Sequence, residues 1–292
     1  MKRIVISGAN GFIGSSLVAF FANHGDVVAL ARTKPDALPE RAVWHTYTLE
    51  EGADPSALAG ADCVIHCALA VPRRGAPDSD ALNARGSAWL RAAAHEAGCR
   101  RFVFLSSLSA HPGAKSHYGR SKLAIEGALN PNEDLILRPG LVIGRGGLFA
   151  RIVDAIATRR VLPLIDGGRQ PVQTVAIGDL CRVVDALLAS DAAGAYNVAA
   201  PETIASRELF DLIAERLGHK PAYLSVPFGV AFAGATIVEA FGWNLPLTSE
   251  NLLGLRYAHV APLPDFAVTH GIRLRPAKES VDECVAPRHA AP

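Results

Sequence analysis

The residues most suited to chemistry in this chain are a tyrosine and a lysine that stand four positions apart. Tyr118 and Lys122 frame the run Tyr-Gly-Arg-Ser-Lys, and residues at this spacing share one face of a helix. Because a nearby ammonium stabilises a phenolate, we expect Lys122 to lower the pKa of Tyr118. The phenol would then suit proton exchange near neutral pH. Chance matches to this spacing are common, so the pair needs support from its surroundings.

Two hydroxyl side chains supply part of that support. The apolar run 102–105 ends in Ser106 and Ser107, and ligands gather at the carboxyl ends of strands in parallel sheets. A serine at such a strand end can form a hydrogen bond with a substrate carbonyl or alcohol.

A glycine-rich loop near the start of the chain predicts a second kind of site. Residues 8–14 read Gly-Ala-Asn-Gly-Phe-Ile-Gly, between a short apolar strand and a helix expected from Phe12. Glycine permits a tight turn and lets backbone amides approach a pyrophosphate, Gly14 lets the helix pack on the strand, and the helix N-terminus supplies donors. An ordinary glycine turn is the alternative. The position of the glycine-rich loop in the first strand-turn-helix unit of the chain favours dinucleotide binding.

The end of the second expected strand bears on which nicotinamide cofactor binds. NAD sites often place an acidic residue here, but residues 27–33 contain none, since Ala31 holds that position and Arg32 follows it. A guanidinium can pair with a 2′-phosphate through two hydrogen bonds. We therefore predict NADP in preference to NAD, with a solvated surface arginine as the alternative interpretation of Arg32.

Alternating strand-like and helix-like segments must position these residues. Strands that are apolar throughout and alternate with helices indicate an α/β fold with a doubly wound parallel sheet, of the Rossmann type. The strands are expected at 3–7, 27–31, 43–48, 63–67, 101–106 and 135–138, and the helices at 12–24, 83–97 and 118–129.

The pattern changes after residue 140. We expect a helix at 148–158, a strand at 173–177, a helix at 178–189, a short strand at 196–198 that returns to the main sheet, and mostly helices from about residue 203. This predicts a dinucleotide-binding domain of residues 1–143 with 170–199. A smaller, mostly helical substrate-binding region would comprise 144–169 with 200–283, and residues 284–292 would form a tail.

Composition excludes several classes of protein. Of the 292 residues, 50% are hydrophobic and 20% charged, which argues against disorder. A net charge of +1 gives no general field for nucleic acid or an anionic membrane. Five scattered cysteines do not form a disulfide framework and are typical of a cytoplasmic protein. We expect no signal peptide, and the apolar stretch 226–243 is too interrupted for a membrane span and predicts a helix over a pocket or in the core.

Together these segments resemble the extended branch of the short-chain dehydrogenase/reductase superfamily, the NAD(P)-dependent epimerase/dehydratase family. The likeness runs from residue 2 to about residue 281. It is carried by segments 8–14, 62–68, 83–87, 102–107, 118–122, 138–140 and 196–198, and by Asp179.

The resemblance implies a role for each matching residue. Tyr118 would be the general acid/base, Lys122 would hold the nicotinamide ribose and bias Tyr118, and Ser107 would orient the reacting oxygen, with Ser106 or Ser109 as substitutes. The cofactor contacts implied by the resemblance, together with Arg32, are Gly8, Gly11, Phe12, Ile13, Gly14, Ala68, Leu69, Ala70, Ser106, Tyr118, Lys122 and Pro139 with its neighbours 140–142.

Departures from the family pattern bear on the substrate. Sugar-nucleotide epimerases usually carry valine-tyrosine-glycine where residues 110–112 read Ala-His-Pro, and many carry a diphosphate-binding arginine where Gln173 stands. With the apolar stretch 226–247, these features favour a ketone, aldehyde or alcohol substrate. The missing arginine could be replaced by Arg145, Arg151, Arg169 or Arg256. The alternative and commoner interpretation of each is an exposed surface arginine.

We therefore predict an NAD(P)-dependent oxidoreductase that exchanges a hydride at a carbinol or carbonyl carbon of a small molecule. A sugar-nucleotide epimerase or dehydratase that recycles its cofactor is one alternative, and a non-catalytic NAD(P)-binding sensor or assembly protein is another. The resemblance also implies a homodimer built from the helices that carry Asn83 and Tyr118. We expect no metal site, a structural role for Asn83, and a packed core position for His66.

Overall fold

A computed structural model describes residues 3–71, 78–241 and 248–286. The chain divides into two compact units. Unit 1 comprises Met1–Ala110, Ser121–Arg138 and Cys181–Tyr196, and unit 2 comprises His111–Arg120, Pro139–Leu180 and Asn197–Pro292.

The main sheet has eight strands in the order β11-β7-β6-β5-β1-β2-β3-β4. The pairs β1–β2, β2–β3, β1–β5, β5–β6 and β6–β7 are parallel, and β3–β4 is antiparallel. From β3 to β7 this is the strand order of dinucleotide-binding sheets, in which ligands bind at the carboxyl ends where the order reverses, here at β1 and β5. The bounds are β1 (Arg3–Ser7), β2 (Asp26–Ala31), β3 (Ala42–Thr48), β4 (Gly52–Ala53), β5 (Cys63–His66), β6 (Arg101–Leu105), β7 (Leu135–Pro139) and β11 (Gly194–Val198).

Continuous apolar runs form the central strands because both faces of the sheet are covered. Val5, Ile6, Val28, Val64 and Ile65 are fully buried. The predicted doubly wound α/β fold is confirmed, each of the six strands predicted in the first half lies within one residue of its expected ends, and the strand around 196–198 returns to this sheet as expected.

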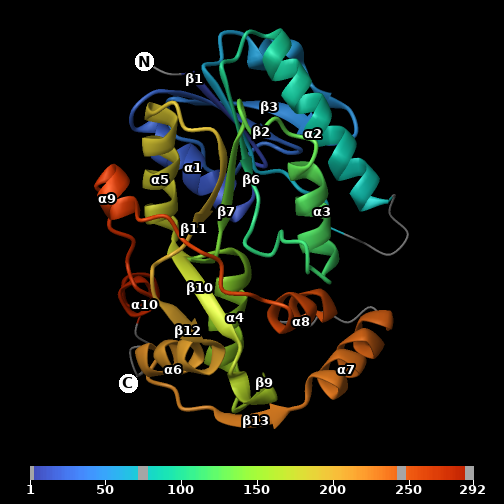
Figure 1. Cartoon of the computed structure of the whole chain (residues 1–292), viewed down its shortest axis with the longest axis vertical. Helices are drawn as coiled ribbons and strands as arrows, with labels where there is room; N and C mark the ends of the chain where they lie inside the picture. Colours follow the sequence, from blue (N-terminus) through green and yellow to red (C-terminus); the bar gives the residue numbers. More distant parts are fainter. Residues whose placement is uncertain (1–2, 72–77, 242–247, 287–292) are drawn as a thin grey trace. The chain divides into compact units, whose positions relative to one another are not determined.

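Helices cover both faces of the sheet. Figure 1 shows α2 and α3 on one side of it and α1 and α5 on the other. Helix α2 begins four residues before its predicted start because the Asp78 carboxylate caps it, accepting a hydrogen bond of 2.9 Å from the Asp80 amide. The bounds are α1 (Phe12–Ala22), α2 (Ser79–Glu96), α3 (His117–Glu126) and α5 (Ile177–Ala189), with a 3-10 turn η1 (Pro55–Leu58).

Unit 2 combines helices with two small sheets, in the orders β12-β10-β8 and β13-β9. Its core packs Phe149 and Ile156 against Leu209, Ile213 and Val281. The region after residue 203 is mostly helical as predicted, but β8, β9, β12 and β13 were not expected. The bounds are β8 (Leu141–Ile143), α4 (Gly147–Thr158), β9 (Val161–Ile165), η2 (Asp166–Gly168), β10 (Pro171–Ala176), β12 (Thr203–Ala205), α6 (Ser206–Arg216), β13 (Ala222–Val226), α7 (Phe228–Ala240), α8 (Ser249–Arg256), α9 (Phe266–His270) and α10 (Ala277–Cys284).

The apolar stretch 226–243 does not form a core helix in its described part, so that alternative is wrong. Ala235 is the buried residue of α7, whereas the Val230 and Ile237 side chains are 64% and 58% exposed. The reason is that α7 packs on α8 along one side. Residues 242 and 243 of the stretch lie outside the described residues. Within the described part of the chain, no helix combines the length and hydropathy needed to cross a membrane.

A buried hydrogen-bond chain links β1, β5 and α2 through His66. Its Nδ1 atom lies 2.6 Å from Ser7 Oγ, and its Nε2 atom lies 2.8 Å from Ser87 Oγ. Burial lowers the pKa of His66 to about 3, and the charge of Lys122 acts in the same direction. His66 is therefore a neutral core histidine, as the sequence predicts.

The burial of neutral His66 predicts that the protein loses stability in acid and that part of this loss is caused by His66 alone. Unfolded His66 has an ordinary pKa near 6.5 and takes up a proton that the folded state excludes, so the unfolding free energy falls as pH drops below about 6.5. The loss approaches about 1.4 kcal/mol per pH unit. Denaturant titrations of wild type and His66→Gln at about pH 7 and pH 5 should show a smaller loss in the variant. His24→Gln, at an exposed position, is the control, and equal losses in all three proteins would assign the acid sensitivity elsewhere.

Candidate functional site

The glycine loop brings backbone segments closer together than any side chain would allow. Gly8 has a φ of +72°, and a Cβ atom on it would lie 2.7 Å from the Ala68 nitrogen. A Cβ atom on Gly14 would lie 2.2 Å from the Gly8 carbonyl oxygen. The expectation that Gly14 lets α1 pack against the first strand is therefore confirmed. The loop itself is closed by a 2.8 Å hydrogen bond from the Gly11 amide to the Gly8 carbonyl.

The first turn of α1 presents donors suited to an anion. Gly11 is the N-cap residue and makes no side-chain cap hydrogen bond, so the amides of Phe12, Ile13 and Gly14 are not capped by it. These amides and the dipole of the helix favour a phosphate group at this end. The cradle at Gly8 and Gly14, which a Cβ atom would fill, fits the pyrophosphate of a dinucleotide.

Asn10 is part of this loop and is a polar contact that was not predicted. Its Nδ2 atom donates to the Thr33 carbonyl at 2.9 Å and lies 3.0 Å from Thr33 Oγ1. This ties the glycine loop to the segment after β2, next to the exposed Arg32. The feature of the sequence that could have indicated this contact is a polar residue between two glycines of the loop.

The segment after β5 is held by side chains from two other elements. Ser7 Oγ accepts a 3.4 Å hydrogen bond from the Ala68 amide. Asn83 Oδ1 accepts from the Ala70 amide at 2.7 Å, and Asn83 Nδ2 donates to the Ala70 carbonyl at 2.9 Å. Asn83, buried in α2, also reaches Ser121 Oγ at 3.3 Å. These contacts agree with the structural role expected of Asn83, and they fix the path of residues 68–70.

Ser106 and Ser107 have different surroundings at the end of β6. Ser106 is buried, and its hydroxyl donates to Glu126 Oε1. Ser107 is half-buried and accepts a 3.1 Å hydrogen bond from the Ser109 amide, which leaves its hydroxyl proton free to donate. The arrangement favours Ser107 over Ser106 as the hydroxyl that would meet a substrate.

Helix α3 carries the tyrosine and the lysine one turn apart. Tyr118 is 40% exposed, and its amide donates to Glu250 Oε2 at 3.3 Å. Lys122 is buried, its ammonium donates to the Leu105 carbonyl, and it lies 4.5 Å from the centre of the Phe104 ring. Burial lowers the pKa of Lys122 to about 8.

The predicted residues fall in both units. Unit 1 holds the glycine loop, Arg32, residues 68–70, both serines and Lys122, all at or after the carboxyl ends of parallel strands or on α3. Tyr118 and Pro139 are grouped with unit 2.

A partly buried ion pair between the end of α3 and β7 was missed from the sequence. Arg138 Nε donates to Glu126 Oε1 at 2.9 Å and to Oε2 at 3.1 Å. Glu126, at the end of α3, is 7% exposed. Its distance of four residues from Lys122 was visible in the sequence, but nothing there distinguished it from a solvated helix residue.

Gln173 occupies the position where a diphosphate-binding arginine was expected in sugar-nucleotide enzymes. Its Nε2 atom donates to the Ala261 carbonyl at 2.9 Å, and its Oε1 atom accepts from the Ala261 amide at 2.8 Å. The neighbouring Asn197 donates to the Pro262 carbonyl at 2.8 Å. The Gln173 amide is thus used to hold the segment after α8, and a Cβ atom on Gly140 would lie 2.2 Å from the Gln173 carbonyl oxygen.

The segment held by Gln173 also brings two histidines together. The rings of His111 and His259 have their centres 4.3 Å apart, and His111 Nδ1 accepts a 3.1 Å hydrogen bond from the Gly113 amide. Burial, and then the neighbouring His259, lower the pKa of His111. Of the arginines considered as replacements at position 173, Arg256 forms a 3.3 Å ion pair with Asp166.

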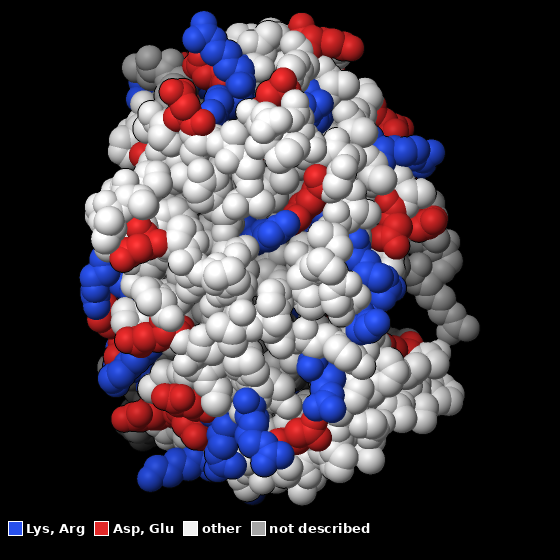
Figure 2. All heavy atoms as spheres, in the orientation of Figure 1, with Lys and Arg blue, Asp and Glu red and all other residues white. Residues whose placement is uncertain are grey.

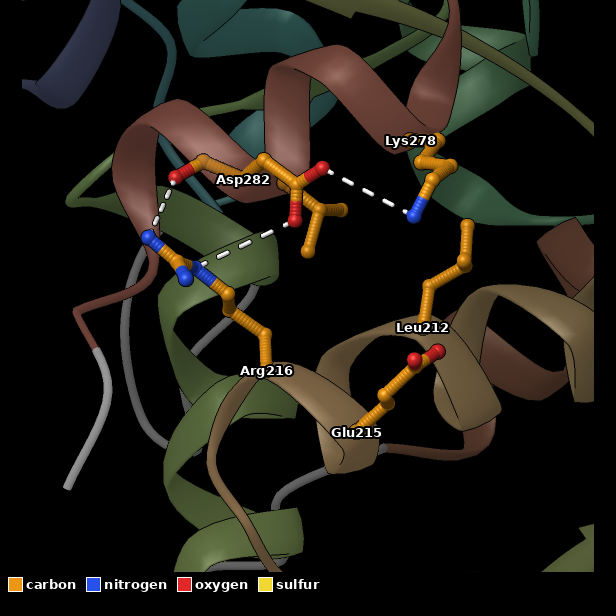
Figure 3. A pocket seen from close by; sticks show the side chains of 6 residues that line it. Leu212, Glu215, Arg216, Lys278 and Asp282 are labelled. Carbon is orange, nitrogen blue, oxygen red and sulfur yellow. Dashed lines mark hydrogen bonds and ion pairs between the residues drawn. The ribbon is translucent and has the colours of Figure 1, made fainter.

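Unit 2 has a polar hollow between α6 and α10 (Figure 3). It has a volume of about 210 Å³ and is lined by Leu212, Glu215, Arg216, Lys278, Val281 and Asp282. Its two cations both pair with Asp282, at 3.9 Å for Arg216 and 3.8 Å for Lys278. It contains no predicted site residue.

The surface and the cysteines bear on other classes of ligand. Figure 2 shows basic and acidic side chains interspersed on the visible face, with no large field of one sign. Among the described residues, the five cysteines are free and no group of three histidine, cysteine or acidic side chains is placed to hold a metal ion.

Comparison with known proteins gives a family match and a shared fold. A family model described as the NAD dependent epimerase/dehydratase family matches residues 4–199. A ceramide reductase of Caulobacter vibrioides is 27% identical over 270 residues, which cover 86% of this chain and 81% of the relative. The crystal structure of gox2253 has a TM-score of 0.75 at 20% identity and covers 98% of this chain and 97% of its own. DesIV, a dTDP-glucose 4,6-dehydratase from Streptomyces venezuelae with NAD and TYD bound, has a TM-score of 0.71 at 19% identity, with coverage of 97% and 95%.

The close approach at the glycine loop predicts a severe effect of one added methyl group. Gly14→Ala would place Cβ against the Gly8 carbonyl, so we expect the unfolding free energy to fall by about 2 kcal/mol or more. Gly234→Ala is the matched control on α7, where a Cβ atom meets nothing within 4 Å and helix propensity rises by up to about 1 kcal/mol. Thermal unfolding of both variants tests this, and equal midpoints would show that α1 can move away.

Proposed function

The chain belongs to the NAD dependent epimerase/dehydratase family, and we propose that within it the protein is an NAD(P)-dependent oxidoreductase that exchanges a hydride at a carbinol or carbonyl carbon. One observation carries the proposal. The Lys122 ammonium donates to the carbonyl of Leu105, the last residue of β6. Leu105 is two residues before Ser107, and Lys122 is one helical turn after Tyr118. Ser107 and the Lys122 ammonium therefore lie by the strand end where such sheets bind ligands, and Tyr118 precedes Lys122 by one turn on α3.

The glycine loop supports binding of the dinucleotide. The amides at the start of α1 and the cradle at Gly8 and Gly14 would hold the pyrophosphate. Residues 68–70, fixed by Asn83 and Ser7, would line the path of the cofactor, and Pro139 would approach the nicotinamide. When bound, the nicotinamide supplies the acceptor or donor of the hydride.

The side chains of the chain supply the proton chemistry. The Tyr118 phenol would donate a proton to the substrate oxygen in reduction or take it in oxidation. The Lys122 ammonium would bind the ribose hydroxyls and stabilise the phenolate through its charge. Ser107, with its hydroxyl proton free, would donate to the same oxygen and orient it. Because the pKa of Lys122 is lowered to about 8, its charge, and with it this assistance, would be lost as pH rises above about 8.

An apolar carbonyl or alcohol is the substrate class best supported. The side chain of Gln173 is committed to Ala261, so this position offers no group to a sugar-nucleotide diphosphate. The relative named for reduction of ceramide points in the same direction. The similarity to a dTDP-glucose 4,6-dehydratase structure keeps a sugar-nucleotide enzyme as the second candidate. A cytoplasmic location and a homodimer formed through α2 and α3 belong to the same proposal.

The central test is removal of the phenol hydroxyl. Tyr118→Phe should lower turnover of an aldehyde or ketone by about 10²-fold or more, while the affinity for reduced cofactor stays within about twofold, because the ring remains. Tyr257→Phe, at another exposed tyrosine, is the control. The measurement is NAD(P)H absorbance for turnover and fluorescence for binding. Unchanged turnover in the Tyr118 variant would remove this residue from the mechanism.

The same assay separates the two candidate functions. A net oxidoreductase consumes one reduced cofactor for each product molecule, whereas an epimerase or dehydratase regenerates its cofactor in each cycle. Continuous loss of NAD(P)H absorbance with a ketone or aldehyde supports the first. Conversion of a nucleoside diphosphate sugar with no change in absorbance would favour the second.

The choice of cofactor depends on Arg32. Arg32→Ala should weaken NADPH binding by about 10-fold or more, since a charge-assisted hydrogen bond contributes about 1.5–3 kcal/mol, and should leave NADH binding unchanged. Arg100→Ala, at another exposed arginine, controls for the general loss of positive charge. Tighter binding of NADH than NADPH by the wild-type protein would contradict the predicted preference.

A further inference from the structure

Glu126 joins three elements through polar contacts that are buried at Ser106 and partly buried at Arg138. Its carboxylate accepts hydrogen bonds from the Ser106 hydroxyl at the end of β6 and from Arg138 on β7. Glu126 itself ends α3 and lies on the face of that helix that carries Lys122, one turn earlier, and Tyr118, two turns earlier. The contact set therefore connects the helix with the acid/base pair to the carboxyl ends of two strands.

Burial makes this contact set strict. Glu126 is 7% exposed, and a buried carboxylate that loses its partner costs several kcal/mol. A shift of α3 by one turn would move its side chains about 5.4 Å along the helix axis and would separate Glu126 from both Ser106 and Arg138. The ion pair thus fixes the register of α3 against the sheet.

Three titratable groups of the described residues interact electrostatically with the Lys122 ammonium, and their charge states differ. His66 and Cys67 come from β5 and the residue after it, and Glu126 from α3. Burial lowers the pKa of His66 to about 3 and raises that of Cys67 to about 12, so both are uncharged at neutral pH. Glu126, which is ion-paired with Arg138, is the anionic member of this set.

We propose that Glu126 is a positioning residue for Lys122: its carboxylate, held by Arg138 and Ser106, keeps the ammonium charged and in place at the end of β6. The inference rests on the proposed function only for what the ammonium then does, which is to bind the cofactor ribose. Glu126 does not touch the reacting atoms. It acts through Lys122 and through the register of α3.

If the Glu126–Arg138 ion pair were purely structural, loss of Glu126 would change the pKa of Lys122 in the opposite direction. If loss of Glu126 merely loosened the helix, water would reach Lys122 and its pKa would rise toward the ordinary value of about 10.4. If the carboxylate stabilises the charged ammonium, its removal lowers that pKa, because burial then acts without the opposing charge.

The test is an NMR titration of the full chain labelled at lysine Cε, with the Lys122 signal assigned from Lys122→Arg. In Glu126→Gln we expect the Lys122 midpoint to fall by about one pH unit. Glu126→Asp keeps the charge and should stay close to wild type. Asp134→Asn is the matched control, since Asp134 is a 1% exposed carboxylate in the same unit, bound by Arg91 Nε at 2.7 Å, and it should leave the midpoint unchanged.

An unchanged or raised midpoint in Glu126→Gln would overturn the proposal. Should that variant not fold, Glu126→Gln combined with Arg138→Met removes both charges and leaves neither unpaired, and the same fall in the midpoint is required of it. The proposed function fails separately, if Lys122→Met binds NADPH and NADH as tightly as wild type does.

Discussion

The backbone of α1 passes so close to the end of β1 that residue 14 has no room for a side chain. A Cβ atom there would lie 2.2 Å from the Gly8 carbonyl oxygen, and one on Gly8 would meet Ala68 after β5 at 2.7 Å. These two contacts set where the helix begins relative to both strands at the point where the strand order reverses. The amides that would hold a phosphate, and the segment that Asn83 fixes, depend on this approach. A bulkier residue would move the helix and remove the cradle together.

The interior next to this edge contains both neutral polar groups and charged ones. His66 and Cys67 are buried in forms that stay uncharged at neutral pH, and their hydrogen-bonding or packing needs no counter-ion. The Lys122 charge acts on both of them, and Glu126, which is ion-paired with Arg138, is the carboxylate whose charge favours the ammonium. The ammonium is also bound by a strand carbonyl and by the face of Phe104. These contacts with Lys122 offset part of the free-energy cost of burying its ammonium.

Most of the main sheet could be predicted because the sequence of each strand shows directly that the strand is buried. The runs that form β1, β2, β5 and β6 are apolar at nearly every position, which fits burial on both faces. The small strands of unit 2 offer no such signal. In β9, Val161 and Pro163 are exposed while the residues between and after them are buried, and a proline in a five-residue run argues against a strand by local rules. Strand β9 exists because β13, nearly sixty residues later, pairs with it.

The same limit of local information explains which site residues the sequence could identify. The glycines, Tyr118 and Lys122 have spacings that carry their chemistry, so they could be selected without knowledge of the fold. Glu126 could not, since a glutamate near a helix end is most often solvated, and only the return of β7 brings Arg138 to it. Ser106 and Ser107 are neighbours in the chain, yet Glu126 takes the hydroxyl of one and leaves that of the other. The buried Glu126 carboxylate therefore does more here than stabilise the helix, because it binds one of two adjacent hydroxyls and leaves the other without this partner.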